Sequence, residues 1–317
     1  MIVVLDGYAL NPGDLTWNGL RKLGEVQIYE RTPQEWIVER ARDADIILTN
    51  KTRLASATLA NLPNLKYIGA LATGYDVIDV EAARARGITV TNVPTYGTES
   101  VAQFTIALLL ELCQHVGIHN QAVQGGAWLQ SPDWVFWRTP LVELWGKTMG
   151  IIGFGRIGRQ VGRIAQALGM RVIASDSIEQ DAPDWPGFAW FTIDQLMQEA
   201  DVVSLHCPLT KETANIVNAN RLSRMKPSAF LLNTSRGPLV VESDLASALN
   251  ERWLAGAALD VLCVEPPNAA NPLFQARNCI MTPHIAWATK EARTRLLDAA
   301  VANLAAYLEG KPQNVVS

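Results

Sequence analysis

Short runs of apolar and β-branched residues recur along the chain, and segments with helical spacing separate most of them. Each run is shorter than an ordinary helix and is typical of a buried strand. The predicted strands are residues 1–5, 45–49, 65–72, 88–93, 148–154, 171–175, 201–206, 229–234, 255–261 and 279–283. Because strands alternate with helices, the pattern predicts an α/β fold with parallel sheets covered on both faces.

Helix boundaries and two unusual segments refine this pattern. Thr32 to Glu35 (TPQE) is a capping box with proline at the first helical position, and Gly87 and Gly169 stand where helices should end. Residues 98–126 predict one long helix that links two domains. Residues 290–309 predict a final helix whose apolar face docks, we expect, on the first domain.

Residues 127–148 hold four of the ten tryptophans, with little periodicity. Loose aromatic surface is common at sites of association, so this segment is interpreted as a protruding arm or an interface. A loop that packs on its own core is the alternative.

Composition narrows the class of protein. A chain of 317 residues that is 49% hydrophobic and 18% charged is long enough for two packed domains. The net charge of −4, with scattered Lys and Arg, argues against nucleic acid as a partner. Four widely spaced cysteines predict reduced thiols, and no apolar segment approaches the ~20 residues of a membrane span. A soluble, cytoplasmic protein is therefore expected, without a metal site, because His115 and His119 lack a third ligand nearby.

The strongest local motif is GFGRIG, which places Gly153, Gly155 and Gly158 between a strand and a helix. The glycines permit a tight turn, close approach of a pyrophosphate and close helix packing, which is the pattern of a dinucleotide site. Asp176 follows at the end of the next strand, where a carboxylate accepts ribose hydroxyls and repels a 2′-phosphate. The sequence therefore favours NAD over NADP; a merely structural turn is the weaker reading.

Several polar residues follow other predicted strands, where ligands collect in open α/β sheets. Arg236, Asp260, Glu265 and His284 are placed to converge on one crevice. Each alone is equally consistent with an ordinary loop residue, a surface ion pair or a helix cap. Their joint placement at strand ends favours a catalytic site.

The motifs GFGRIG, HCPLT, NTSRG, ALDV…EPP and TPHIAWAT occur in this order over nearly the whole chain. In this the sequence resembles the D-isomer-specific 2-hydroxyacid dehydrogenase family. The resemblance implies two Rossmann-like, doubly wound parallel-sheet domains, with the nucleotide domain inserted into a flavodoxin-like substrate domain. The expected boundaries are 1–98 with 288–317 for substrate, and 99–287 for NAD. A homodimer is also inferred from it, together with the Trp-rich segment.

The resemblance also implies roles for individual residues. The catalytic residues are expected to be Arg236, Glu265 and His284, with His284 as acid/base. The cofactor-binding residues are expected to be Gly153, Gly155, Arg156, Ile157, Gly158, Asp176, His206, Pro208, Thr234 and Asp260. The substrate-binding residues are expected to be Lys51, Thr73, Gly74, Tyr75, Arg236 and Trp287.

Within the family the chain most resembles the hydroxypyruvate reductase (glycerate dehydrogenase) group, on the segments LATGYDVIDVEAARARGITVTNVPTYGTESVAQFTIALLLEL and PLVELWGKTMGIIGFGRIG and on the tryptophan of HIAWAT. The expected reaction is NADH-dependent reduction of hydroxypyruvate, or of glyoxylate, to the 2-hydroxy acid. Two alternatives stay open. One is a dehydrogenase for a bulkier oxo acid or for phosphoglycerate, and the other is a non-catalytic protein that senses NAD(H).

Overall fold

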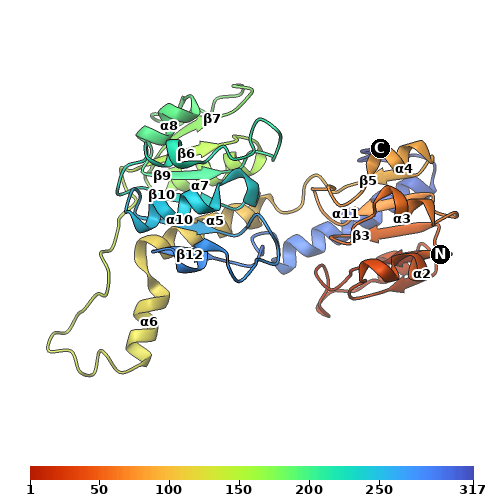
Figure 1. Cartoon of the computed structure of the whole chain (residues 1–317), viewed down its shortest axis with the longest axis horizontal. Helices are drawn as coiled ribbons and strands as arrows, with labels where there is room; N and C mark the ends of the chain where they lie inside the picture. The colour runs from red at the N-terminus through yellow and green to blue at the C-terminus, as the bar shows by residue number, and fades with distance from the viewer. The chain divides into compact units, whose positions relative to one another are not determined.

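The computed structural model describes residues 1–317 and divides them into two compact units. Unit 1 comprises Met1–Gly97 and Trp287–Ser317, and unit 2 comprises Thr98–Ala286. Both ends of the chain therefore belong to unit 1 (Figure 1). Each unit contains one sheet in which all strand pairs are parallel, so the predicted α/β class is confirmed.

The sheet of unit 1 has five strands in the order β2-β1-β3-β4-β5, which is the flavodoxin-like order. The strands are β1 (Ile2–Val4), β2 (Val26–Ile28), β3 (Ile46–Thr49), β4 (Tyr67–Ala70) and β5 (Thr89–Thr91). Its helices are α1 (Asn18–Arg21), α2 (Ile37–Ala41), α3 (Ser56–Ala60), α4 (Val80–Ala85) and α11 (Lys290–Leu308), with a 3-10 turn at Gln34–Trp36. Helices α1 and α11 cover one face, and α2 to α4 cover the other.

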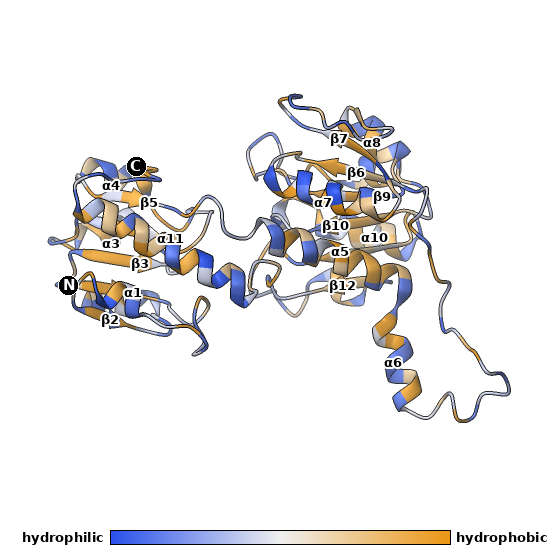
Figure 2. Ribbon diagram, turned by 180° about the vertical axis from the view of Figure 1, so that it is seen from behind, coloured by the Kyte–Doolittle hydropathy of each residue, from blue (hydrophilic) through white to orange (hydrophobic).

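Burial on both faces explains the continuous apolar runs of these strands. In β1, Val3 packs into the core beneath α2 to α4, whereas Ile2 and Val4 pack into the core beneath α1 and α11. The strands are accordingly among the most hydrophobic parts of the chain (Figure 2). Helix α11 buries its apolar side, including Leu296 and Leu304, in the second of these cores. The expected docking of the last helix on the first domain is therefore observed.

The sheet of unit 2 has seven strands in the order β12-β11-β10-β9-β6-β7-β8. Counted from β6, this order contains the 3-2-1-4-5-6 arrangement of dinucleotide-binding folds. The strands are β6 (Thr148–Ile152), β7 (Arg171–Ser175), β8 (Ala189–Trp190), β9 (Val202–Leu205), β10 (Phe230–Asn233), β11 (Gly256–Leu259) and β12 (Cys279–Met281). The helices are α5 (Thr98–Gln114), α6 (Val116–Gln124), α7 (Arg156–Ala167), α8 (Ile193–Glu199), α9 (Ala219–Leu222) and α10 (Glu242–Asn250), with 3-10 turns at Gly237–Leu239 and Pro272–Gln275. Helices α5 and α7 cover one face, and α8 to α10 the other.

The prediction of a single helix over residues 98–126 is wrong. The chain forms α5 and α6, which are bent by 58° about His115. His115 has a left-handed backbone with φ of 48°, which interrupts helical hydrogen bonding. Helix α5 is buried along much of its length, whereas α6 buries none of its residues and projects from unit 2 together with the segment that follows it (Figure 1). No single helix is long and apolar enough to span a membrane, and only the bent pair α5 and α6 together meets those limits.

The structure differs from the sequence prediction in two further respects, the capping box at Thr32 and two edge strands. The Thr32 hydroxyl donates to Leu5 O (2.6 Å) and caps no helix, because Pro33 is the N-cap residue of the 3-10 turn Gln34–Trp36 and α2 begins only at Ile37. The strands β2 and β8 were not predicted. Both are edge strands without fully buried residues, so neither has the continuous apolar run that marks the inner strands. The helix ends expected at Gly87 and Gly169 are confirmed, since both glycines have positive φ just beyond α4 and α7.

Candidate active site

The glycine-rich turn lies between β6 and α7, where the strand order of unit 2 reverses. A Cβ on Gly153 would lie 2.3 Å from Cys207 N, and one on Gly158 would lie 2.2 Å from Gly153 O, so both positions require glycine. Gly155, in contrast, faces open space, with no atom within 4 Å of an added Cβ. The turn is therefore closely packed inside unit 2 and open at its second glycine, which is the form that a pyrophosphate needs.

The groups beside this turn fit a dinucleotide. Gly155 precedes α7, and no side chain of the N-cap residue caps this helix, so its N-terminus lies beside the turn where an anion is favoured. The Asp176 carboxylate accepts from Phe154 N (2.6 Å) and from Ile178 N (3.3 Å). It is thereby fixed at the end of β7, where ribose hydroxyls bind in this fold. Sequence reasoning did not foresee the contact with Phe154.

The loop after β9 carries His206 and Pro208. His206 Nε2 is 2.8 Å from Ser204 Oγ, and desolvation lowers the pKa of His206 to about 3. The ring is therefore neutral in the physiological range and is no proton donor. Pro208 is exposed. In the next loop the Thr234 hydroxyl is buried against the Thr105 hydroxyl of α5 (2.8 Å), so its side chain is engaged within the protein.

Glu265 and His284 form a close pair. His284 Nδ1 lies 2.7 Å from Glu265 Oε2, and the two side chains are 27% and 34% exposed. The other carboxylate oxygen, Oε1, accepts from Leu262 N (3.0 Å). No hydrogen bond occupies Nε2 of His284. The pair thus holds one ring nitrogen and leaves the second free to exchange a proton with a ligand.

His284 has a left-handed backbone with φ of 56°, and Asp260 holds this turn. The buried Asp260 carboxylate accepts from Thr282 Oγ1 (2.6 Å), Ile285 N (2.9 Å) and Ala286 N (2.8 Å). Its backbone carbonyl accepts from His284 N (2.9 Å). Burial raises the pKa of Asp260, against these hydrogen bonds. The residue organises the turn that presents His284, and its contact with a nicotinamide carboxamide stays a prediction.

Arg236 lies on the loop after β10, which two unforeseen residues shape. Asn233 Nδ2 donates to Arg236 O (2.8 Å) and Asn233 Oδ1 accepts from Ser235 N (3.0 Å). A Cβ on Gly237 would lie 2.0 Å from the carbonyl carbon of Leu262, so this loop is in direct contact with the loop that leads to Glu265. The structure therefore brings the loops of the three predicted catalytic residues together in unit 2. The glycine directly after the arginine was the only signal for this contact in the sequence.

The remaining predicted residues lie in unit 1. Lys51 is exposed after β3, and Thr73, Gly74 and Tyr75 follow β4. The N–H groups of these last three residues donate no hydrogen bond within the chain. Trp287 is half-buried and packs edge-to-face on Tyr96, with ring centroids 6.3 Å apart.

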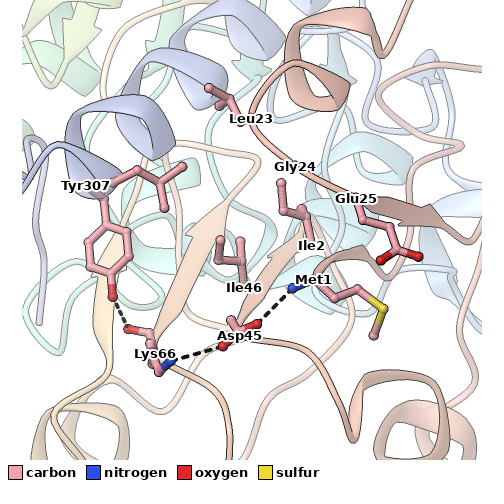
Figure 3. Close-up of a pocket in the computed structure, with 10 residues that line it drawn as sticks. Met1, Ile2, Leu23, Gly24, Glu25, Asp45, Ile46, Lys66 and Tyr307 are labelled. Carbon is pink, nitrogen blue, oxygen red and sulfur yellow. Dashed lines mark hydrogen bonds and ion pairs between the residues drawn. The ribbon is translucent and has the colours of Figure 1, made fainter.

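A cavity of about 520 Å³ lies at the amino ends of the strands of unit 1, opposite to the strand ends that carry Lys51 and residues 73–75 (Figure 3). It is lined by Ile2, Asp45 and Lys66 at the amino ends of strands, where Asp45 pairs with Lys66 (3.1 Å) and with the terminal amine (2.8 Å). Ligands of open α/β sheets bind at the carboxyl ends, and no predicted site residue lines this cavity. It is therefore separate from the candidate active site.

Comparison with known proteins gives a consistent family. The model of the D-isomer-specific 2-hydroxyacid dehydrogenase NAD-binding domain matches residues 106–286. A hydroxypyruvate reductase from Blautia hydrogenotrophica is 54% identical, covering 100% of this chain and 99% of that protein. A glycerate dehydrogenase from Methylorubrum extorquens is 41% identical and covers 92% of each. The solved structure of an NADPH-dependent glyoxylate/hydroxypyruvate reductase from Sinorhizobium meliloti, in complex with NADP and malonate, has a TM-score of 0.84 at 30% identity and covers 100% of this chain and 96% of that one.

These matches span both units and agree with the order of the motifs, the two sheet topologies and the dinucleotide turn. The reaction that the relatives share is the reduction of small 2-oxo acids, an oxidoreductase activity on a CH–OH group. The chain belongs to the D-isomer-specific 2-hydroxyacid dehydrogenase family, as an oxidoreductase of the hydroxypyruvate reductase and glycerate dehydrogenase type.

Proposed function

We propose that the chain reduces hydroxypyruvate to D-glycerate with NADH, and glyoxylate to glycolate as a side activity. The observation that carries the proposal is the 2.7 Å pair of His284 and Glu265, with Nε2 free, beside the loop of Arg236. Bound NADH supplies the hydride that adds to the carbonyl carbon. The protein has to supply the proton and hold the substrate.

The proton comes from Nε2 of His284. In the protonated ring, Nδ1–H donates to the Glu265 carboxylate, which stabilises the positive charge and fixes the ring orientation. Nε2–H then points away from Glu265, toward the carbonyl oxygen of the substrate. Transfer of this proton as the alkoxide develops completes the hydroxyl group and leaves His284 neutral.

Arg236 is proposed as the side chain that binds the substrate carboxylate. A guanidinium offers a fixed fork of N–H donors that matches a carboxylate and also polarises the adjacent carbonyl. The N–H groups of Thr73, Gly74 and Tyr75, which have no partner within the chain, supply further donors. Lys51 and Trp287 are proposed as additional substrate contacts.

A panel of oxo acids assayed with both cofactors tests this function. We expect the highest kcat/KM for hydroxypyruvate with NADH, a lower value for glyoxylate, and lower values again for phenylpyruvate and 3-phosphohydroxypyruvate. NADPH should be used less well, because Asp176 would face its 2′-phosphate. Greater efficiency with either of the larger acids would contradict the substrate assignment, and tight NADH binding without any turnover would favour an NAD(H) sensor.

The Asp176→Ser variant isolates the basis of the cofactor preference. Loss of charge-assisted hydrogen bonds to the ribose should lower kcat/KM with NADH by about 10- to 100-fold and narrow the gap to NADPH. Asp184→Ser is a matched control, because Asp184 is exposed in the same loop. An unchanged NADH to NADPH ratio in Asp176→Ser would rule out this carboxylate as the selector.

The Trp-rich segment is proposed as the contact of a homodimer. Its side chains are unusually exposed for aromatic residues, with Trp134 at 85%, Trp145 at 77% and Trp137 at 65%. Sedimentation should show a dimer that dissociates at least tenfold more readily in Trp134→Ser, because buried tryptophans carry much of the energy of interfaces. Trp36→Ser, which changes an exposed tryptophan of unit 1, should leave association unchanged. If the wild-type protein sediments as a monomer, the proposed homodimer is wrong.

A cytoplasmic location is also proposed. Burial raises the pKa of Cys113 and Cys207 to about 11 and that of Cys279 to about 12. Thiols of this kind are structural and unreactive, and no disulfide stabilises the fold. A reducing compartment suits such a chain.

A further inference from the structure

Asp6 is the most heavily hydrogen-bonded carboxylate of unit 1, and neither the motifs nor the reaction accounts for it. It follows β1, at the carboxyl edge of the sheet. Its Oδ1 accepts from Asn50 N (2.8 Å), and its Oδ2 accepts from Lys51 N (2.5 Å), Thr52 N (2.8 Å) and Thr49 Oγ1 (3.3 Å). Three consecutive backbone N–H groups after β3 thus converge on one side chain, in the manner of an anion-binding nest.

The loop that Asp6 holds is joined to the next strand end. Asn50 is buried, and its Nδ2 donates to Leu71 O (2.6 Å). Leu71 N in turn donates to Thr49 O (2.7 Å). The path of the chain just beyond β4 is therefore set by the loop after β3, and that loop is set by Asp6.

Beyond Leu71 the chain presents its free donors. Thr73 is anchored on its far side, since its hydroxyl donates to Val93 O (2.8 Å) and its carbonyl accepts from Asn92 Nδ2 (2.7 Å). Between the anchors at Leu71 and Thr73, the backbone has little freedom to turn. Beyond Thr73, Tyr75 O accepts from Ile78 N (2.9 Å), and the N–H groups of Thr73, Gly74 and Tyr75 have no partner within the chain.

We propose that Asp6 is a positioning residue for the substrate carboxylate. It fixes the loop of Lys51 directly and, through Asn50 and Leu71, fixes the free N–H groups of residues 73–75. The inference rests on the proposed function, which assigns the carboxylate to those N–H groups. Asp6 accepts hydrogen bonds from the loop after β3 and is not itself proposed as a substrate contact.

The Asp6→Asn variant separates positioning from simple charge. All four neighbours of the carboxylate are donors, so an amide NH₂ group must face at least one of them and displace the loop. Removal of a negative charge from unit 1 would, by itself, favour an anionic substrate and lower KM. If Asp6 positions the donors, its replacement should instead raise KM, because misplaced donors bind the substrate carboxylate less well. The direction of the change in KM therefore distinguishes the two effects.

The experiment measures steady-state kinetics with hydroxypyruvate and NADH, and NADH affinity by fluorescence, in the full-length protein. We expect Asp6→Asn to raise KM for hydroxypyruvate by about tenfold, in line with a lost charge-assisted hydrogen bond, with kcat within about twofold and NADH affinity unchanged. Asp43→Asn, which removes the same charge from an exposed position before β3, should change none of these values.

Asn50→Ala, which removes the link to Leu71 O and leaves Asp6 intact, should raise the same KM. The double variant should show less than the product of the two effects, because both act along one path. If Asp6→Asn fails to fold, the KM of Asn50→Ala for hydroxypyruvate tests the inference by itself. If a folded variant has an unchanged or lower KM and the wild-type protein turns over hydroxypyruvate, the inference about Asp6 is wrong and the proposed function stands. If the wild-type protein shows no turnover, both are wrong.

Discussion

His284→Asn is expected to lower kcat for hydroxypyruvate reduction by about 10²- to 10⁴-fold, the usual contribution of a positioned general acid. The variant removes the ring whose Nε2 is proposed to supply the proton. Asparagine is chosen because His284 has φ of 56°, a conformation that asparagine adopts readily and alanine does not. The loss can then be attributed to the missing proton donor and not to a strained backbone.

NADH binding provides the internal check, since the cofactor turn and Asp176 are untouched by this change. The dissociation constant of NADH, measured by nucleotide fluorescence, should remain within about twofold of wild type. A tenfold change would correspond to a difference in binding free energy of ~1.4 kcal/mol. His115→Asn is the matched control, because His115 also has a left-handed backbone (φ of 48°) and lies at the α5–α6 break. Turnover by His284→Asn at the wild-type rate would eliminate His284 as the acid.

Arg236→Lys should lower kcat/KM for hydroxypyruvate by about 10²- to 10⁴-fold, even though it preserves the charge. Two charge-assisted hydrogen bonds of about 1.5–3 kcal/mol each are lost when a planar fork is replaced by a single ammonium group. Steady-state kinetics should also show a fall in kcat, because the same donors polarise the carbonyl as negative charge develops on its oxygen.

Chemical rescue distinguishes this role from a structural one. Added guanidinium should restore part of the activity of Arg236→Ala, and it should have no such effect on Arg277→Gln, an exposed arginine elsewhere in unit 2. Asn233, which holds the Arg236 loop through two hydrogen bonds, is intact in every variant. An Arg236→Lys enzyme with wild-type kcat/KM would show that the substrate carboxylate is bound elsewhere.

The inner strands were predictable because burial on both faces demands continuous apolar residues, as in β10, where Leu231 and Leu232 belong to cores on opposite faces. The edge strands β2 and β8 lack that demand and left no comparable signal. The break at His115 was also hidden, because it depends on one backbone conformation and helical spacing continues beyond it.

In the candidate site, too, some features could be predicted from the sequence and others could not. The strand-end rule and the order of motifs predicted Arg236, Glu265 and His284 as catalytic residues, since each follows a predicted strand. The sequence could not reveal that Asp260 binds the turn of His284, because these hydrogen bonds join segments 22 to 26 residues apart. Contacts between loops depend on how the sheet is assembled, and no local pattern records them.

The position of β12 has a consequence for the lifetime of the active conformation. This three-residue strand is the edge of its sheet, is only half-buried and pairs with β11 alone. Edge segments of this kind open locally at a lower free-energy cost than inner strands. The turn that carries His284 follows directly, and the hydrogen bonds to Asp260 connect it to β11. We therefore expect local opening at this edge to displace His284 before the rest of the sheet unfolds, and the hydrogen bonds of Asp260 to oppose that opening.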